Sequence, residues 1–411
     1  MNRATTYLLI GGGLAAYHAA KQIRRTDSEG RILLVGDEPD LPYDRPPLSK
    51  EFLRGEKDRG DILFDEPKIW SDSLRVDLVL GTAVTGLEPN AHKAILANGD
   101  SIDFDKALLA TGGRPVSLTI PGSDLAGIHY LRTATDASAI RNEATKGSRA
   151  VVVGAGFIGL EVAASLVSIG LKVTVIEAAA HVWPRFADAS LAAYIKDYCH
   201  ERGVEFITGD PVMEFRGEGR VTAVVTQHGQ VAECDMVIVG IGIRPNVELA
   251  ASAELQIDNG VVVDHELRTS HPDIYAAGDV INYPDSIFEK RRRVEHWGHA
   301  EYTGQIAGRN MAGGKDRYNF LSYVWSDIFD LHLEFAGDEE EHDQVIRRAS
   351  NAVDKFAVLY LKKGYLTAYF AVNLEPRDFS VFRRLILAKR NLHGHESDLA
   401  NVDFPVAALL N

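Results

Sequence analysis

Short apolar runs of strand length alternate with helix-forming stretches along the N-terminal half of the chain. The runs Tyr7–Ile10 and Arg31–Val35 flank one alanine-rich stretch, and Ala150–Val153 and Lys172–Ile176 flank another. In both places the first run ends in a glycine-rich turn that opens the helical stretch. This order of strand, turn, helix and strand predicts two βαβ units and therefore an α/β fold with parallel strands.

The first turn has the spacing of a dinucleotide-binding motif. Gly11 predicts a tight turn, Gly13 predicts close approach of the backbone to a pyrophosphate, and Ala16 is small enough for the helix to pack on the strand. The pyrophosphate would lie at the positive N-terminus of the helix. Asp37 follows the second strand, where an acid of this motif bonds a ribose hydroxyl. The alternative is a glycine loop without a nucleotide, which the surrounding strand, helix and acid disfavour.

The second turn fills all three glycine positions of the motif with Gly154, Gly156 and Gly159. The strand after its helix ends at Glu177, whose carboxylate is expected to bond a 2′-hydroxyl and to repel a 2′-phosphate. We therefore expect NADH to be preferred over NADPH, with Arg185 nearby as a cation that would soften the preference. Two such motifs predict hydride transfer between two dinucleotides. A duplicated structural unit with one inactive site is the alternative.

Three further segments carry residues expected near a ligand. Ala110-Thr111-Gly112 is a sharp turn of small residues that would pass close to a nucleotide, and the strand before Gly278-Asp279 ends in a carboxylate beside a glycine. Prolines stiffen the backbone of Pro42–Lys50. That segment is either a surface loop or a rigid holder of Arg45 and Lys50 against an anionic or electron-rich ligand.

The rest of the chain predicts further strands and helices. Short strands bounded by turn signals are expected at 76–80, 93–96, 106–110 and 356–361. A basic amphipathic stretch covers 379–389, and helical periodicity covers 294–312. In the latter, His296 and His299 have a spacing compatible with metal binding, but no third ligand stands out, so a packing or helix-end role is expected.

Composition is that of an ordinary globular protein and excludes several classes. The chain has 411 residues, 45% hydrophobic and 25% charged, which predicts two or three domains. A net charge of −14 argues against broad nucleic-acid binding, and no apolar stretch reaches the roughly 18 residues that span a membrane. With two cysteines and no signal-peptide pattern, a cytoplasmic location is expected.

The motifs together resemble the glutathione-reductase-like flavoproteins. Among these, the chain is most similar to the ferredoxin reductases of bacterial oxygenase systems, of the putidaredoxin reductase and biphenyl dioxygenase reductase type. The resemblance is carried by residues 46–50, 110–113, 130–133, 156–161, 239–242, 277–279 and 325–327. It implies two Rossmann-like dinucleotide-binding domains, one for FAD (1–113 and 240–317) and one for NADH (114–239), and a C-terminal α+β domain (318–411).

The resemblance also implies the residues that touch the cofactors. FAD would contact Gly11, Gly13, Leu14, Ala15, Asp37, Arg45, Lys50, Val84, Ala110, Thr111, Gly112, Arg132, Gly278, Asp279 and Trp297. NADH would contact Gly154, Gly156, Phe157, Ile158, Gly159, Glu161, Glu177, Arg185, Gly240, Ile241 and Gly242. Asp279 would bond the ribityl chain, and Lys50 and Trp297 would lie near the flavin ring. Glu161 would lie near the nicotinamide, and Trp325 where electrons leave.

The implied activity is hydride transfer from NADH to FAD, then single-electron transfer to an iron–sulfur ferredoxin, or a rubredoxin, that feeds an oxygenase. Disulfide reduction is not expected, because Cys199 and Cys234 lie apart in sequence and neither follows a flavin motif. The basic clusters 290–293 and 383–390 are candidate docking patches for an acidic carrier, with ordinary solvated faces as the alternative. No metal is implied, and a monomer or weak homodimer is expected.

A small-molecule electron acceptor is an alternative to the iron–sulfur carrier. Residues 295–300 (Glu-His-Trp-Gly-His-Ala) are also similar to the apoptosis-inducing-factor-like oxidoreductases. That similarity implies an NADH oxidase, or a quinone or ascorbyl-radical reductase, with a small-molecule acceptor. A non-catalytic redox sensor is a third alternative.

Overall fold

The polypeptide divides into two compact units, each assembled from separate stretches of the chain. The computed structural model describes residues 2–183, 189–349 and 354–410. Unit 1 comprises Met1–Asp44, Ile62–Arg114 and Arg244–Tyr323, and unit 2 comprises Arg45–Asp61, Pro115–Ile243 and Val324–Asn411. Each unit contains one of the two glycine turns. The finer division into three domains stays a prediction.

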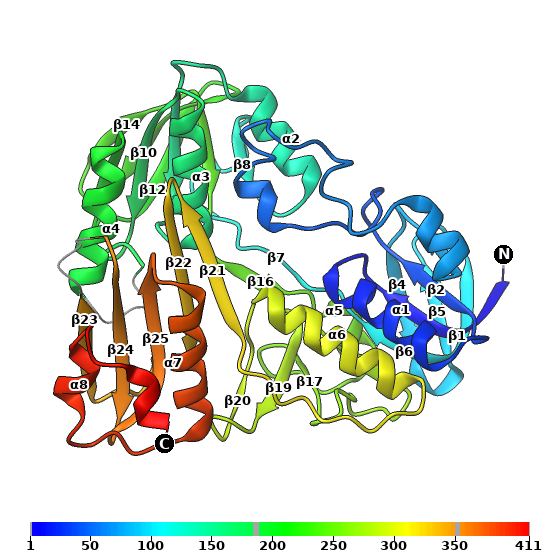
Figure 1. The fold of residues 1–411 in the computed structure, drawn as a ribbon. Coiled ribbons are helices and arrows are strands. Elements are labelled where there is room, and N and C mark those ends of the chain that lie inside the picture. Colours follow the sequence, from blue (N-terminus) through cyan, green and yellow to red (C-terminus); the bar gives the residue numbers. More distant parts are fainter. Residues whose placement is uncertain (1, 184–188, 350–353, 411) are drawn as a thin grey trace. The chain divides into compact units, whose positions relative to one another are not determined.

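Unit 1 is built on a mainly parallel sheet of the order β3-β2-β1-β6-β5-β4, with β18 also paired to β6. Its strands are β1 (Asn2–Ile10), β2 (Ile32–Val35), β3 (Val76–Val79), β4 (Val84–Glu88), β5 (Lys93–Leu96), β6 (Ser101–Leu109) and β18 (Ile274–Ala276). All of β2 and the end of β1 are buried, which is why both are continuous apolar runs in the sequence. Figure 1 shows the helices α1 (Leu14–Thr26) and α6 (Trp297–Met311) lying beside one another in this unit.

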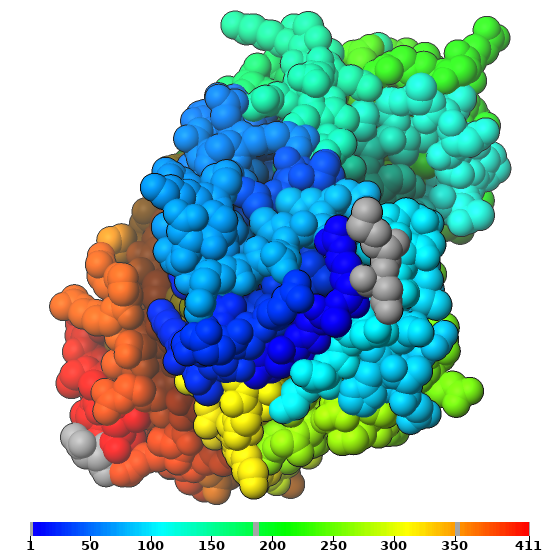
Figure 2. All heavy atoms as spheres, turned by 90° about the vertical axis from the view of Figure 1, so that its right-hand side faces the viewer, coloured from blue at the N-terminus to red at the C-terminus, as the bar shows by residue number. Residues whose placement is uncertain are grey.

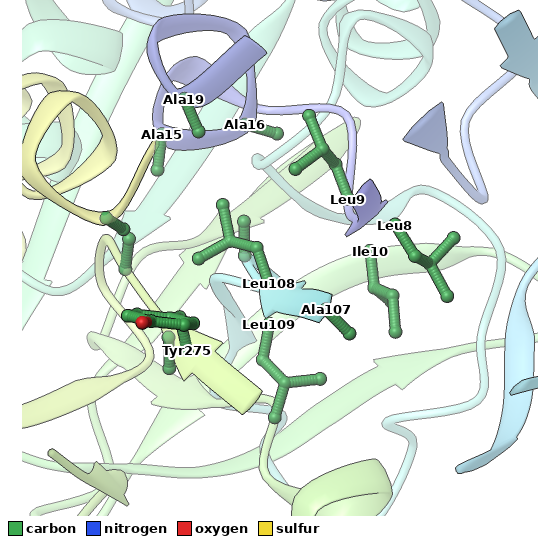
Figure 3. Packing of buried hydrophobic residues seen from close by; sticks show 14 of the residues in the cluster. Leu8, Leu9, Ile10, Ala15, Ala16, Ala19, Ala107, Leu108, Leu109 and Tyr275 are labelled. Carbon is green, nitrogen blue, oxygen red and sulfur yellow. The ribbon is translucent and has the colours of Figure 1, made fainter. Parts of the chain in front are cut away.

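Small residues set the distance between α1 and α6. A Cβ on Gly304 would overlap the carbonyl oxygen of Ala15, and one on Gly308 would lie 2.5 Å from that of Ala19. The two helix backbones therefore touch, which only glycine permits. In Figure 2 the N-terminal residues (dark blue) lie against α6 (yellow). Figure 3 shows Ala15 and Ala19 in one core with Leu9 and Leu108 of the central strands.

Shorter elements complete unit 1. The helix α5 (Glu248–Ser252) and single helical turns at Ile69–Ser73 and Pro89–Ala91 lie between its strands in sequence. A three-stranded sheet has the order β17-β19-β20, with β17 (Val261–Val262), β19 (Ile281–Asp285) and β20 (Lys290–Arg292). The chain also forms a two-stranded sheet from β7 (Gly113–Pro115) and β16 (Ile243–Pro245).

Unit 2 contains a second parallel sheet, of the order β11-β10-β9-β15-β8. Its strands are β8 (Ile128–Tyr130), β9 (Arg149–Val153), β10 (Lys172–Glu177), β11 (Val204–Thr208) and β15 (Met236–Val239). The accompanying helices are α2 (Ala134–Glu143), α3 (Phe157–Ser168) and α4 (Ala189–Glu201), and a helical turn covers Pro46–Ser49. A small antiparallel sheet joins β12 (Val212–Gly217), β13 (Val221–Thr226) and β14 (Val231–Glu233). The parallel order follows from the repeated βαβ pattern of the sequence.

The C-terminal part of unit 2 is an antiparallel sheet of the order β21-β22-β25-β24-β23. Its elements are β21 (Tyr323–Ile328), β22 (Leu331–Gly337), β23 (Gln344–Ala349), β24 (Phe356–Lys362), β25 (Tyr365–Val372), α7 (Pro376–Ala388), α8 (Glu396–Ala400) and a helical turn at Val406–Leu410. Leu333 and Phe370 of this sheet share one apolar core with Leu160 and Ala163 of α3. The C-terminal sheet and the second nucleotide-type sheet therefore stabilise each other.

The elements agree with the sequence predictions, with shifted ends. The mixed α/β architecture is confirmed, the helix expected at 294–312 is α6, and the amphipathic stretch 379–389 lies mostly in α7. The strand expected at 106–110 begins earlier, at Ser101, because β6 pairs with β1 from Asn2 to Ile10. Within the described ranges, no helix combines the length and apolar character needed to cross a bilayer.

Arg348 in β23 holds the C-terminal segment by its backbone. Its guanidinium donates to the carbonyl oxygens of Leu399, Val402 and Phe404 at 3.0–3.1 Å. We expect Arg348→Ala to lower the free energy of unfolding by about 2 kcal/mol, because these carbonyls lose a charged donor. Urea titration measures the loss. The neighbouring Arg347→Ala, which removes a bond to the Ser190 hydroxyl, is the control; an equal loss in both variants contradicts the prediction.

Candidate functional site

Three parallel strands of unit 1 end side by side and bring the predicted turns together. Ile10, Leu109 and Ala276 are paired neighbours at the carboxyl ends of β1, β6 and β18. The chain continues from them into the turn that starts at Gly11, into Ala110-Thr111-Gly112 and into Gly278-Asp279. Ligands of open α/β sheets bind at this edge. The three segments predicted near FAD therefore share one edge of the sheet.

The first turn fits a pyrophosphate. Gly11 has a φ of +118°, and a Cβ there would overlap the carbonyl oxygen of Ala110, so only glycine fits. A Cβ on Gly13, in contrast, would meet nothing within 4 Å. Helix α1 begins after Gly13 without a side-chain cap and without an acid in its first turn. Its first N–H groups and the positive end of its dipole are thus left for an anionic group such as the FAD pyrophosphate.

Asn246 fixes the Ala110-Thr111-Gly112 turn and was not predicted. The side-chain amide of Asn246 donates to the Thr111 carbonyl oxygen at 2.8 Å. The backbone carbonyl oxygen of Asn246 accepts from the Thr111 hydroxyl at 2.8 Å. Its backbone N–H donates to the Gly112 carbonyl oxygen at 2.9 Å. In the sequence, Asn246 is marked only by its place directly after Pro245 and soon after a glycine turn. That local pattern does not indicate Thr111 as its partner, because Thr111 lies far away in the sequence.

Gly278 lies against the start of α1. Its N–H donates to the Thr303 hydroxyl at 3.0 Å, and a Cβ on it would lie 3.2 Å from the Cβ of Ala15. One turn before Thr303, His299 is fully buried and bonds the Tyr318 hydroxyl at 2.8 Å. Burial lowers the pKa of His299 to about 3. The described residues contain no group of three or more His, Cys, Asp or Glu side chains suited to a metal. The burial of His299 agrees with the packing or helix-end role expected from the sequence.

The remaining flavin-side residues of unit 1 come from other segments. Trp297 begins α6, and its indole N–H donates to the Asp44 carboxylate at 2.8 Å, which fixes the ring. Asp37 is exposed just after β2, and Val84 opens β4. Contact of these three side chains with FAD stays a prediction.

The strands β9, β10 and β15 of unit 2 also end side by side. Glu177 is the last residue of β10, and Gly154–Gly159 and Gly240–Gly242 directly follow β9 and β15. Gly154 has a φ of +102°, and a Cβ on it would lie 2.5 Å from the carbonyl oxygen of Gly240. A Cβ on Gly156 would meet nothing within 4 Å, and α3 begins there without a side-chain cap. This turn repeats the geometry of the first and fits a second pyrophosphate.

Glu177 is held in a fixed orientation beside the second turn. Its two carboxylate oxygens accept the backbone N–H groups of Ala155 at 2.7 Å and of Ala179 at 2.8 Å. Both donors are neutral backbone groups, and among the described residues no cation pairs with this carboxylate. Arg185, predicted nearby, lies outside the described residues.

An aromatic cluster that was not predicted supports the start of α3. The ring of Phe157 lies 5.1 Å from that of Trp183 and stacks on Phe370 at 6.4 Å between centroids. Phe370 belongs to β25, so the C-terminal sheet helps to position the second glycine turn. The next residue, Ile158, is 47% exposed and is therefore available to a ligand.

Lys50 and Glu161 form a buried ion pair in unit 2. The Lys50 ammonium lies 3.1 Å from Glu161 Oε1, and the side chains are only 9% and 3% exposed. The hydroxyls of Ser49 and Ser326 donate to the two Glu161 oxygens at 2.5 and 2.6 Å. These serines were not predicted as partners. The ion pair and the two serine hydrogen bonds offset the free-energy cost of burying both charges away from water.

The residues predicted at the flavin are divided between the two units. Arg45, Lys50 and Arg132 belong to unit 2, and the others belong to unit 1. The Arg45 guanidinium donates to the Arg132 carbonyl oxygen at 2.7 Å, which links two of the predicted segments. Trp325 is half-buried in β21, directly before Ser326. The roles of these residues toward FAD stay predictions.

Both cysteines are buried and free. Cys199 and Cys234 are each 1% exposed, and burial raises the pKa of each thiol to about 12. A thiol with such a pKa forms almost no reactive thiolate at neutral pH. The expectation that they are ordinary buried residues is confirmed.

The first of the two basic clusters is occupied by partners within unit 1. Arg291 donates to the Val263 carbonyl oxygen at 2.8 Å, Arg292 pairs with Asp285 at 3.2 Å, and Arg293 pairs with Glu295 at 2.6 Å. The side chains of Arg292 and Arg293 are only 10% and 12% exposed. Arg292 and Arg293 are therefore largely neutralised within unit 1, whereas Arg291 is exposed, and docking by the cluster 290–293 stays a prediction. In the cluster 383–390, Arg384 and Lys389 are exposed.

Comparisons with known proteins agree with this arrangement. Residues 5–304 match the pyridine nucleotide-disulphide oxidoreductase family and residues 323–410 match the reductase C-terminal family. Putidaredoxin reductase of Pseudomonas putida is 34% identical, with 97% of this chain and 96% of that protein covered. The ferredoxin–NAD(+) reductase component of the anthranilate 1,2-dioxygenase system of Burkholderia cepacia is 38% identical, with 94% and 95% covered.

A solved structure agrees as well. In the covalent putidaredoxin reductase–putidaredoxin complex, the matching chain has a TM-score of 0.93 at 32% identity, with 99% of this chain and 98% of that chain covered. The two glycine turns, each at an uncapped helix N-terminus, accord with the cofactors of this class, FAD and NAD(H). The chain therefore belongs to the pyridine nucleotide-disulphide oxidoreductase family, and within it to the ferredoxin–NAD(+) reductases that also carry the reductase C-terminal domain.

Proposed function

We propose that the protein takes a hydride from NADH through FAD and passes single electrons to a small iron–sulfur carrier, a [2Fe–2S] ferredoxin or a rubredoxin, that feeds an oxygenase. The observation that carries the proposal is one complete nucleotide turn in each unit, together with thiols that are buried and unreactive. Relatives named as ferredoxin–NAD(+) reductases support the class of acceptor. We further propose a cytoplasmic location and a monomer or weak homodimer.

The chain's own residues would bind and orient the cofactors. Bound FAD supplies the redox chemistry, since flavins accept a hydride and release electrons singly. The open N-termini of α1 and α3 would hold the two pyrophosphates. Asp279 would bond the ribityl chain, and Trp297, fixed by Asp44, would border the flavin ring. Lys50, fixed by Glu161, would lie near the flavin ring.

Steady-state oxidation of NADH tests this proposal. The yellow, FAD-loaded protein is supplied with NADH and cytochrome c, with and without a [2Fe–2S] ferredoxin. Large stimulation of cytochrome c reduction by ferredoxin is expected. Equal rates with and without ferredoxin, with oxygen or a quinone accepting the electrons, would instead favour the oxidase class.

Glu177 should set the preference between the nicotinamide cofactors. We expect Glu177→Gln to reduce the kcat/KM ratio of NADH to NADPH by about tenfold to a hundredfold, because a neutral amide no longer repels a 2′-phosphate. Glu205→Gln, an exposed acid on β11, is the control and should leave the ratio unchanged. An unchanged ratio in the Glu177 variant would show that another group selects the cofactor.

The exposed cations of α7 and its end are candidates for docking the carrier. We expect Arg384→Glu combined with Lys389→Glu to slow ferredoxin reduction by about tenfold and to weaken its salt dependence. Flavin reduction by NADH should be unaffected, as measured by stopped flow. Lys172→Glu, an exposed lysine on β10, is the charge-matched control. Carrier kinetics that do not change would remove this assignment.

A further inference from the structure

A cavity of about 300 Å³ lies within unit 2 beside the Lys50–Glu161 pair. Its lining includes the buried side chains of Glu161 and Ser165, which are 3% and 2% exposed. It also includes Glu56 and Ser168, which are exposed. The cavity therefore extends from the surface of the unit to a buried carboxylate.

Glu161 is the member of the ion pair that lines the cavity. Its Oε1 lies 3.1 Å from the Lys50 ammonium, and its other oxygen accepts from the Ser49 hydroxyl. The hydroxyl of Ser165, also in the lining, donates to the Ser49 carbonyl oxygen at 2.7 Å. A molecule in the cavity would thus reach Lys50 through the Glu161 carboxylate.

A second acid of the lining is coupled to a histidine. Asp327 in β21 accepts a hydrogen bond from the His332 ring at 2.8 Å, and the His332 side chain is 46% exposed. Burial by itself raises the pKa of Asp327, but the hydrogen bond and charge of His332 and the charge of Lys50 outweigh it and lower this pKa. The bond to Asp327 in turn raises the pKa of His332. Histidine is the side chain whose ordinary protonation change falls in the physiological pH range.

This cavity has the size and the polar groups to hold several water molecules. Its volume is many times what one water molecule needs, and its walls offer several hydrogen-bonding groups. Glu56, Glu161 and Asp327 outnumber the one guanidinium, that of Arg54, which lies 2.7 Å from Glu56. An anion would therefore be repelled. A metal is not favoured either, since the part of the chain that the structure describes holds no suitable group of three ligands.

We infer that water in this cavity carries protons between the Lys50–Glu161 pair and solvent, and that Asp327 of the lining and its partner His332 exchange them with solvent. The inference rests on the proposed function, which places Lys50 beside the flavin ring. A hydride brings two electrons and one proton, and each carrier takes one electron. One NADH and two oxidised carriers thus give NAD(+), two reduced carriers and one proton. That proton would pass from Lys50 to Glu161, to cavity water and to His332.

Proton release can be measured without NADH or a carrier protein. The holoenzyme is reduced with dithionite, freed of excess reductant and mixed with ferricyanide in the presence of a pH-indicator dye. Two ferricyanide ions take the two electrons, and one proton appears in solvent. We expect Ala164→Leu, inside the cavity, and Ser168→Trp, at its outer wall, to slow the appearance of this proton by about tenfold or more. His332→Gln should also slow it, and imidazole buffer should restore the rate.

Ser138→Trp in α2 is the matched control. Both serines donate to the carbonyl oxygen four residues earlier, Ser168 at 2.8 Å and Ser138 at 2.7 Å, but Ser138 lies outside the cavity lining. Proton release at the wild-type rate in the cavity and His332 variants overturns the inference. Because the assay uses neither NADH nor ferredoxin, failure of the proposed function would show separately, as absence of ferredoxin reduction.

Discussion

Gly11→Ala protein is expected to purify without flavin, whereas Gly154→Ala protein is expected to purify yellow but to bind NADH weakly. Both glycines have a positive φ. In both, a Cβ would overlap the backbone of the residue that follows a neighbouring strand, Ala110 after β6 for Gly11 and Gly240 after β15 for Gly154. An alanine must therefore displace the turn that faces the pyrophosphate. We expect a loss of about tenfold or more in affinity for the corresponding cofactor, which is about 1.4 kcal/mol or more.

Each of these two variants is the control for the other. Flavin content is read from the absorbance of the purified protein, and NADH binding from isothermal titration, which needs no bound flavin. If the turns are independent sites, each change affects one measurement only. Loss of flavin in Gly154→Ala with normal flavin in Gly11→Ala would contradict the assignment of the two turns.

Breaking the Lys50–Glu161 pair is expected to be the most costly single change to stability. Lys50→Met leaves a buried carboxylate without its cation, and Glu161→Met leaves a buried ammonium without its anion. Removing one partner of a buried pair typically costs about 3–5 kcal/mol. The double variant Lys50→Met/Glu161→Met should be more stable than either single variant, because no charge is left unpaired.

The double variant also separates a structural role from a functional one. Urea denaturation measures stability, and stopped-flow mixing with NADH measures the rate of flavin reduction. We expect stability to recover in the double variant while flavin reduction stays slow, because the group beside the flavin ring is still missing. Recovery of both would show that the pair only holds the fold together.

Local sequence was sufficient for the elements that a short stretch specifies by itself. The glycine turns at Gly11 and Gly154 depend on backbone freedom and on a strand and helix directly beside them, so their spacing predicted their geometry. The same holds for α6, whose helical periodicity is visible along its length. It also holds for the buried cysteines, since an isolated cysteine away from a redox motif is usually buried.

The partners that complete the site were not predictable, because they come from segments distant in the chain. Asn246 holds the Thr111 turn, Ser326 holds Glu161, and Phe370 supports Phe157, and none of these pairs has a local pattern. The positive charge of residues 290–293 could be read from the sequence, but the residues of unit 1 that pair with these arginines could not. Charge along a sequence does not show which cations are already neutralised by carboxylates and carbonyl oxygens of the fold.

The most direct test of the central claim is a single turnover. One equivalent of NADH is mixed with the FAD-loaded protein and an excess of oxidised [2Fe–2S] ferredoxin, and flavin and iron–sulfur absorbance are followed together. We predict that flavin absorbance falls and then returns while two ferredoxins are reduced for each NADH consumed. Consumption of NADH with ferredoxin left oxidised, and electrons delivered to oxygen or a quinone instead, would contradict the account.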